Sequence, residues 1–151
     1  MAIYLQPFKK YAAFKGRARR KEYWGFLAFI YAIAFVAGIV LGTAGATTES
    51  ESLLAVQAIL TAVTLVPTLA VGVRRLHDSN RSGWWILMAF IGGGLAKLAN
   101  KLLTVNEATL PLAGLMIVVS LVMLVSLFVF LLLPGTAGDN RFGPNPRDAE
   151  Q

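Results

Sequence analysis

Long apolar stretches constrain this chain more than any other feature of its sequence. Residues 23–42, 53–73 and 110–133 contain no charged side chain. At a rise of 1.5 Å per residue, about 20 residues of helix match a hydrocarbon core of about 30 Å. Because lipid offers the backbone no hydrogen bonds, such runs cross a membrane as helices. We therefore predict transmembrane helices at these three positions.

A fourth apolar run, residues 84–103, is long enough to cross but carries Lys97, Lys101 and three consecutive glycines at 92–94. We predict that it is a further span, with a flexible break at the glycines and with both lysine side chains extended toward the far headgroups. The alternative is a segment that stays at the membrane surface. The last run ends in a turn-rich tail, residues 134–151.

The composition supports a membrane protein. Hydrophobic residues make up 56% of the chain and charged residues 15%, against about 25% charged residues in soluble domains. The sequence has no cysteine and one histidine, so we expect no disulfide, no metal site and no cofactor. The predicted fold is all-α: one membrane domain over residues 1–151, built as a multi-pass transmembrane helical bundle of four spans.

The positions of lysine and arginine predict the orientation. Seven of the fourteen lie within residues 9–21, in a basic segment (1–22) that precedes the first span. Because positive loops stay in the cytoplasm, we expect the loop at 74–83 and both termini to be cytoplasmic. If 84–103 does not cross, the charge tally is the same and the tail is exported, so four crossings are favoured by span length and by the reach of Lys97 and Lys101. Clustering beside a span indicates a membrane surface rather than nucleic acid.

The first run also raises the question of a cleaved signal peptide. Its length exceeds the apolar core of about 7–15 residues that such peptides carry, and the region before it is long. We therefore expect residues 23–42 to be a retained anchor.

Three motifs carry a family resemblance. They are FKGRARRKEYW at 14–24, RRLHDSNRSGWW at 74–85 and PGTAGDNRFGPNP at 134–146. Together, and in this order, they resemble the small bacterial inner-membrane proteins grouped as domain of unknown function 805. The resemblance covers nearly the whole chain and implies a multi-pass protein of the bacterial inner membrane, but no activity, cofactor or ligand. Between Trp85 and Pro134 the chain departs from the family pattern with a longer apolar region.

The RRLHD segment allows three interpretations. It is a plain positive-inside loop, or it is a buried bracket if the second span continues through it, since Arg74 would then share a helix face with His77 and Asp78. The third interpretation is a binding or catalytic site in which His77 and Asp78 exchange protons, although no nucleophile lies beside them. Arg75 would belong to the same cluster in each case.

The other two motifs extend this candidate cluster. Basic residues before the first span either signal topology or bind anionic lipid, at about 1 kcal/mol each. We expect the NRFGPNP tail to dock on the RRLHD segment. The additional members of the predicted structural or binding cluster are Arg17, Arg19, Arg20, Glu22, Arg81, Asn140 and Arg141.

Aromatic and small residues supply two further predictions. Rings near span ends favour the headgroup zone, and the expected interfacial anchors are Tyr23, Trp24, Trp84, Trp85 and Phe142. Small residues recur every four positions at Ala34, Gly38 and Gly42, which favours close helix packing. We expect these small residues to pack against another helix of the same chain; the alternative is that they mediate self-association.

These features favour a non-enzymatic membrane protein. The leading hypothesis is a scaffold or accessory subunit whose basic cytoplasmic face binds anionic lipid or a protein partner. A small oligomeric transporter or channel is one alternative, although only Lys97 and Lys101 supply charge within its spans. A lipid-headgroup enzyme that uses His77 and Asp78 is the other.

Overall fold

The computed structural model describes residues 3–47 and 50–146, and within them the chain is helical with no β-strand. The long helices are α2 (Arg20–Thr43), α3 (Glu51–Asp78), α4 (Leu87–Leu103) and α5 (Leu110–Leu132). Short helices flank them: η1 (Ile3–Leu5), α1 (Gln6–Lys9), η2 (Gly83–Ile86) and η3 (Glu107–Thr109). Four helical segments, Arg20–Thr43, Glu51–Asp78, Gly83–Leu103 and Glu107–Leu132, are long and apolar enough to cross a membrane. The predicted all-helical, multi-span fold is confirmed.

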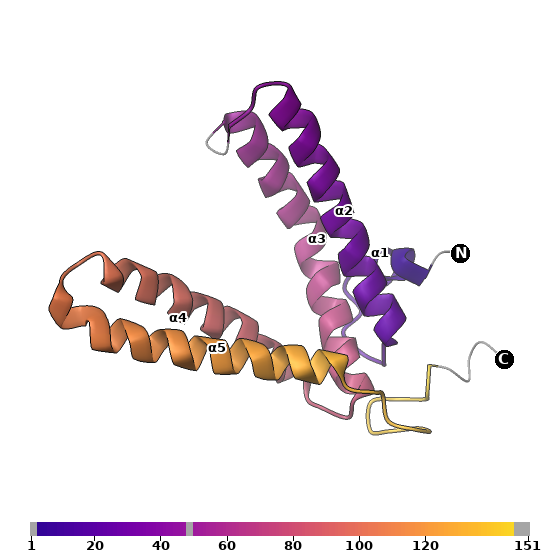
Figure 1. Cartoon of the computed structure of the whole chain (residues 1–151). Helices are drawn as coiled ribbons and strands as arrows, with labels where there is room; N and C mark the ends of the chain where they lie inside the picture. Colours follow the sequence, from indigo (N-terminus) through magenta and orange to yellow (C-terminus); the bar gives the residue numbers. More distant parts are fainter. Residues whose placement is uncertain (1–2, 48–49, 147–151) are drawn as a thin grey trace.

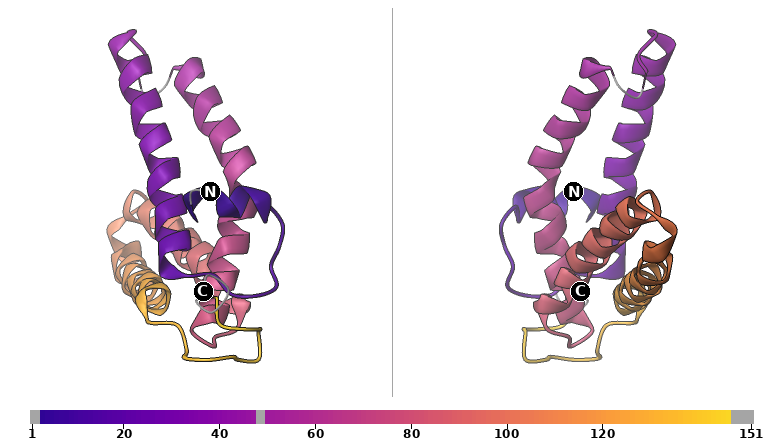
Figure 2. Two further views of the ribbon diagram at one scale, coloured as in Figure 1. Left: turned by 90° about the vertical axis from the view of Figure 1, so that its right-hand side faces the viewer. Right: turned by 90° about the vertical axis from the view of Figure 1, so that its left-hand side faces the viewer.

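The long helices form two hairpins that diverge from a shared base (Figure 1). Helices α2 and α3 make the first hairpin, and α4 and α5 make the second. The start of α2, the end of α3, the start of α4 and the end of α5 all lie at the base, together with the C-terminal tail. Two further views, each turned by 90° from Figure 1 and seen from opposite sides, show the same arrangement (Figure 2). The fold therefore brings all three sequence motifs together.

Helix α3 is longer than the predicted second span. It continues through RRLHD to Asp78, so the prediction of a loop over 74–83 is wrong for its first five residues. The remaining connector turns at Asn80, which has a φ of 56° in the left-handed region that asparagine tolerates. At 28 residues, α3 is about 42 Å long and exceeds a hydrocarbon core of about 30 Å. Its last turns therefore project beyond the hydrocarbon at the base.

Helix α4 runs unbroken through the three glycines, so the predicted break is wrong. Gly92 packs against α5: a Cβ atom on it would lie 3.1 Å from Leu124 Cγ. The Ser120 hydroxyl donates a hydrogen bond of 2.7 Å to the Gly92 carbonyl. Close packing of this kind compensates for the low helix propensity of glycine, about 1 kcal/mol per residue.

The apolar core is concentrated at the base. Phe26, Val71, Leu76, Leu127 and Leu131 are buried there and come from α2, α3 and α5. Above the base most apolar side chains of the long helices are exposed. Exposed apolar surface on this scale marks contact with another molecule or with lipid, as four candidate spans require.

Candidate functional site

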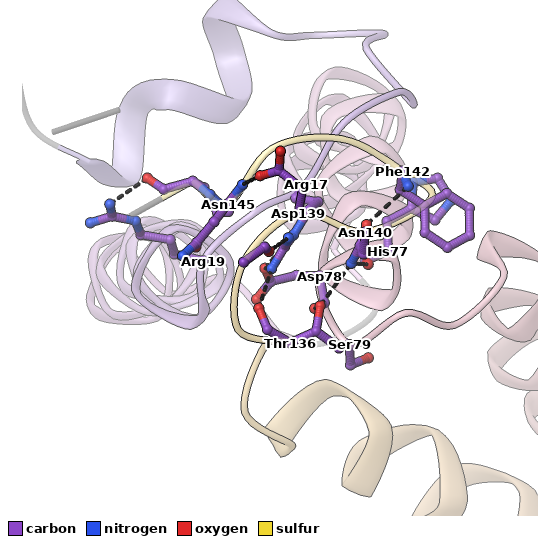
Figure 3. A network of polar contacts seen from close by, with 12 residues as sticks. Arg17, Arg19, His77, Asp78, Ser79, Thr136, Asp139, Asn140, Phe142 and Asn145 are labelled. Atoms are coloured by element: carbon purple, nitrogen blue, oxygen red, sulfur yellow. Dashed lines mark hydrogen bonds and ion pairs between the residues drawn. The ribbon is translucent and has the colours of Figure 1, made fainter. Parts of the chain in front are cut away.

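Asp78 lies at the centre of a buried polar network at the base (Figure 3). Its Oδ1 accepts a hydrogen bond of 3.0 Å from Arg17 Nε, and its Oδ2 accepts one of 2.5 Å from Arg75 Nη1. The three residues are at most 7% exposed. One carboxylate thus holds two guanidinium groups that would otherwise be buried without a counter-charge, which is costly.

The two arginines also bind backbone carbonyls from other segments. Arg17 Nη2 donates to Thr136 O at 2.7 Å, which ties the N-terminal segment to the tail. Arg75 Nε donates to Leu131 O at 3.0 Å, and Arg75 Nη2 donates to Leu133 O. Carbonyls at the end of a helix lack partners within the helix, so Arg75 caps the end of α5. The network joins three distant parts of the chain.

A second buried ion pair joins α2 to α3. Arg74 Nη1 donates to Glu22 Oε1 at 2.7 Å, and both side chains are at most 9% exposed. The bracket interpretation expected Arg74 to act beside His77 and Asp78. That pairing is wrong, because Arg74 faces α2 while Asp78 pairs with Arg75, three residues before it on the same helix.

His77 is held between the N-terminal segment and the tail. Its Nδ1 lies 3.2 Å from Gly16 O, and Gly16 has a φ of +86° that favours glycine. The Phe142 ring stacks on the imidazole at 3.9 Å between centroids, with the two planes 3° apart. Asn140 Nδ2 donates to His77 O at 3.0 Å. The expected docking of the tail on RRLHD is present, with Phe142 half-buried against His77; its role as an interfacial anchor stays a prediction.

Further tail contacts involve Gly135, Thr136 and Asn80, which the sequence did not single out, and Arg141, which it did. Thr136 N donates to Asp78 O at 2.9 Å, and Arg141 Nη2 donates to Asn80 O at 3.1 Å. Gly135 approaches Asp78 so closely that a Cβ atom on it would lie 2.2 Å from Oδ2. The only sequence signal for Gly135 and Thr136 was their place in the PGTAGDN motif.

Tyr23 and Trp24 are at least partly buried, whereas Trp84 and Trp85 are exposed. Tyr23 is 7% exposed in the apolar core, so its predicted anchor role is wrong: its ring lies against Gly72 of α3. Trp24 is partly buried and meets Phe128 of α5 edge to face, at 5.7 Å between ring centroids. Trp84 and Trp85 are exposed at the start of the second hairpin, so their anchor role stays a prediction.

Arg81 stabilises the base by a cation–π contact, with its guanidinium carbon 3.8 Å from the centroid of the Phe130 ring.

The stripe of small residues at Ala34, Gly38 and Gly42 does not pack against another helix in the part of the chain that the structure describes. Within the described residues, no atom other than those of the adjacent residues and the backbone of the same helix lies within 4 Å of a Cβ built on Gly38 or Gly42, and Ala34 is exposed. Packing of this stripe inside the chain is therefore wrong, and self-association stays a prediction.

An open cleft of about 510 Å³ lies beside the polar network. Its walls carry four cationic side chains and the Asp78 carboxylate. They are formed by Arg17, Arg19, Arg20, Lys21, Asp78, residues 135–138, Asn145 and Pro146. We call this feature the basic cleft. Arg19 Nη2 donates to Pro146 O, whereas Arg20 and Lys21 are exposed.

The chemistry of the basic cleft suits an anion. Helix α2 begins at Arg20, and the amide groups of a first helical turn add partial positive charge to the lysine and arginine side chains. No group of three histidine, aspartate or glutamate residues that could hold a metal occurs in the part of the chain that the structure describes.

Comparison with known proteins agrees with this architecture. The family described as "Protein of unknown function (DUF805)" matches residues 11–144. The chain belongs to this family. Its relatives in Escherichia coli K12 include the inner membrane protein YhaH, 36% identical over 97% of this chain and 98% of YhaH. The inner membrane protein YhaI is 35% identical over 97% of each chain. The uncharacterized protein YiiR is 31% identical over 91% of this chain and 88% of YiiR.

No solved structure matches the chain. Two of the DUF805 relatives are named inner membrane proteins, and the four candidate spans agree with those names. The predicted family and the predicted localisation are confirmed: the protein is a multi-pass protein of the bacterial inner membrane.

Proposed function

We propose that this DUF805 protein is a non-enzymatic membrane scaffold or accessory subunit whose basic cleft binds anionic lipid headgroups at the cytoplasmic surface. The exposed cations on the cleft carry the proposal. Arg20 and Lys21 are exposed in the first turn of α2, where the helix leaves the base. A protein partner with an acidic surface is the alternative occupant of the same cleft.

The position of the cleft supports a lipid ligand. Anionic lipids concentrate negative charge at the cytoplasmic surface, and each lysine or arginine near that surface contributes about 1 kcal/mol of binding free energy. With both termini cytoplasmic, the base faces this surface. The scaffold then holds the cleft open, because Arg17 on its wall is fixed by Asp78 and by tail carbonyls.

The contacts of His77 and Asp78 favour a structural role for both residues over acid–base catalysis. Both carboxylate oxygens of Asp78 accept hydrogen bonds from arginines that hold the base together. The His77 ring is covered by Phe142 on one face. These contacts leave the pair poorly placed to exchange protons with a substrate.

The test compares two double variants that remove the same charge. R20Q/K21Q neutralises the exposed cations of the cleft, and K97Q/K101Q neutralises two exposed lysines on α4. In nanodiscs that contain phosphatidylglycerol and phosphatidylcholine, R20Q/K21Q should bind phosphatidylglycerol more weakly by about 2 kcal/mol, close to thirtyfold, in native mass spectrometry. Lys97 and Lys101 do not line the basic cleft, so K97Q/K101Q should keep the tightest phosphatidylglycerol site of the wild type. Equal binding by both double variants would contradict the proposal.

A further inference from the structure

One face of the first hairpin carries polar side chains far from either end of the helices. A groove of about 380 Å³ runs between α2 and α3 on this face. The α3 side of the groove bears Gln57, Thr61, Thr64 and Thr68, at spacings of four and three residues that place them on one helix face. Tyr31 lines the α2 side. We call this feature the polar groove.

The polar groove lies at the depth of the hydrocarbon. Gln57 is six residues past Glu51, the first residue of α3, which places it about 9 Å along the helix axis. Tyr31 is eleven residues past Arg20, the first residue of α2, or about 16 Å along that axis. Both positions are well inside helices that cross the membrane, so water does not hydrate these side chains in a single copy.

The polar groups at the two ends of this face lack partners. Tyr31 is 69% exposed, and Gln57 is exposed as well. Among residues 3–47 and 50–146, nothing forms a hydrogen bond with the Gln57 carboxamide or with the Tyr31 hydroxyl. Thr64 differs, because its hydroxyl donates to Leu60 O at 2.6 Å. An unpaired amide in an apolar medium costs several kcal/mol, so this face needs a partner that supplies hydrogen bonds.

A second groove on the same hairpin provides the contrast. It has a volume of about 590 Å³, and every residue that lines it is apolar, Phe29, Val36, Val40 and Val56 among them. Acyl chains can cover an apolar groove at no cost in free energy, but they cannot form hydrogen bonds with the side chains of a polar groove. The polar groove is lined by apolar residues as well, namely Leu27, Ile30, Ala34, Leu60 and Leu65, so the two grooves differ in the hydrogen-bonding groups of the other five residues.

We propose that the polar groove is the contact surface for a second copy of this chain. A carboxamide and a phenol each donate and accept hydrogen bonds, so the face is complementary to itself. Two copies related by a two-fold axis would pair Gln57 with the same face of the partner, as an isologous interface requires. The hairpins diverge from the base, and the second hairpin leaves this part of the first hairpin uncovered (Figure 1). The inference is independent of lipid binding at the basic cleft.

Disulfide crosslinking tests the contact directly, because the chain has no cysteine of its own. Single cysteines are placed at Gln57, on the groove, and at Ile59, which is 63% exposed and lines neither groove. On oxidation in membranes at native expression levels, Q57C should give a crosslinked dimer, and I59C should stay monomeric. Absence of the Q57C dimer, or equal crosslinking of both variants, would overturn the proposal.

A second measurement uses the exposed position of Gln57, where truncation leaves the core intact. In Förster transfer between labelled copies diluted into bilayers, Q57A should raise the dimer dissociation constant about fivefold, equivalent to about 1 kcal/mol. I59A is the control and should leave it unchanged. A protein that stays monomeric at all dilutions would overturn the proposal. This is the result expected if acyl chains or a different protein fill the groove. A dimer that Q57A does not weaken would also overturn it.

Discussion

Replacing Asp78 with asparagine should destabilise the base more than any other single change of charge in the tail or its contacts. Asparagine keeps the size of the side chain but removes its charge. The carboxylate holds Arg17 at 3.0 Å and Arg75 at 2.5 Å, and all three side chains are nearly inaccessible to solvent. The amide nitrogen of the introduced asparagine would be a donor facing one of two guanidinium groups that are donors themselves.

The expected cost follows from the buried ion pairs. Removing one partner of such a pair costs about 3–5 kcal/mol, because the other charge stays buried without compensation. At about 1.4 kcal/mol per factor of ten, this shifts the unfolding equilibrium by at least a hundredfold. The C-terminal tail should be released first, since it is held to α3 and the N-terminal segment through contacts that surround Asp78.

The measurement is the free energy of reversible unfolding in a lipid–detergent bicelle, obtained by steric trapping. D139N is the matched control: it makes the same chemical change in the same tail, but Asp139 is exposed and accepts one hydrogen bond, from Asn145 N at 3.2 Å. Its cost should stay below about 1 kcal/mol. A D78N variant that is no less stable than D139N would refute the buried-network reasoning.

Two further substitutions test the close contacts. G135A should cost about 1–3 kcal/mol of unfolding free energy by overpacking, because its Cβ atom would overlap the Asp78 carboxylate; the same bicelle assay measures this cost, and wild-type stability would contradict the contact. S120A should cost about 1 kcal/mol through loss of the buried hydrogen bond to Gly92 O. The S120A effect should appear as increased proteolysis of the second hairpin alone, and equal cleavage of both hairpins would contradict it.

The spans could be predicted from the sequence because hydropathy and length are local properties. The run at 110–133 corresponds to α5 within one residue at its end. The glycines at 92–94 show where local reasoning fails: helix propensity predicts a break, but packing of Gly92 on α5 keeps the helix continuous. The end of α3 stayed open between a loop and a continued helix, since charged residues resemble a loop until their partners on other segments are known.

The sequence predicted which residues belong to the candidate site, but not which of them form ion pairs with one another. The three motifs indicated that Arg17, Asp78 and Asn140 belong to one cluster, and the structure brings them together. Which arginine pairs with which carboxylate depends on how α3 is rotated about its axis relative to α2. This rotation cannot be deduced from the spacing of residues along α3. Spacing therefore paired Arg74 with Asp78, whereas the structure pairs it with Glu22, 52 residues away in sequence.

The topology of the two hairpins tests the account most directly, because the proposed function places the shared base on the cytoplasmic side. Single cysteines at exposed positions report on four sites: Lys15 and Ala137 at the base, and Thr47 and Val105 at the two tips. With an impermeant thiol reagent, we expect Thr47→Cys and Val105→Cys to label in spheroplasts, and the two base positions to label only after lysis. Labelling of Ala137→Cys in intact spheroplasts, with Val105→Cys protected, would place the tail outside and contradict a common cytoplasmic base.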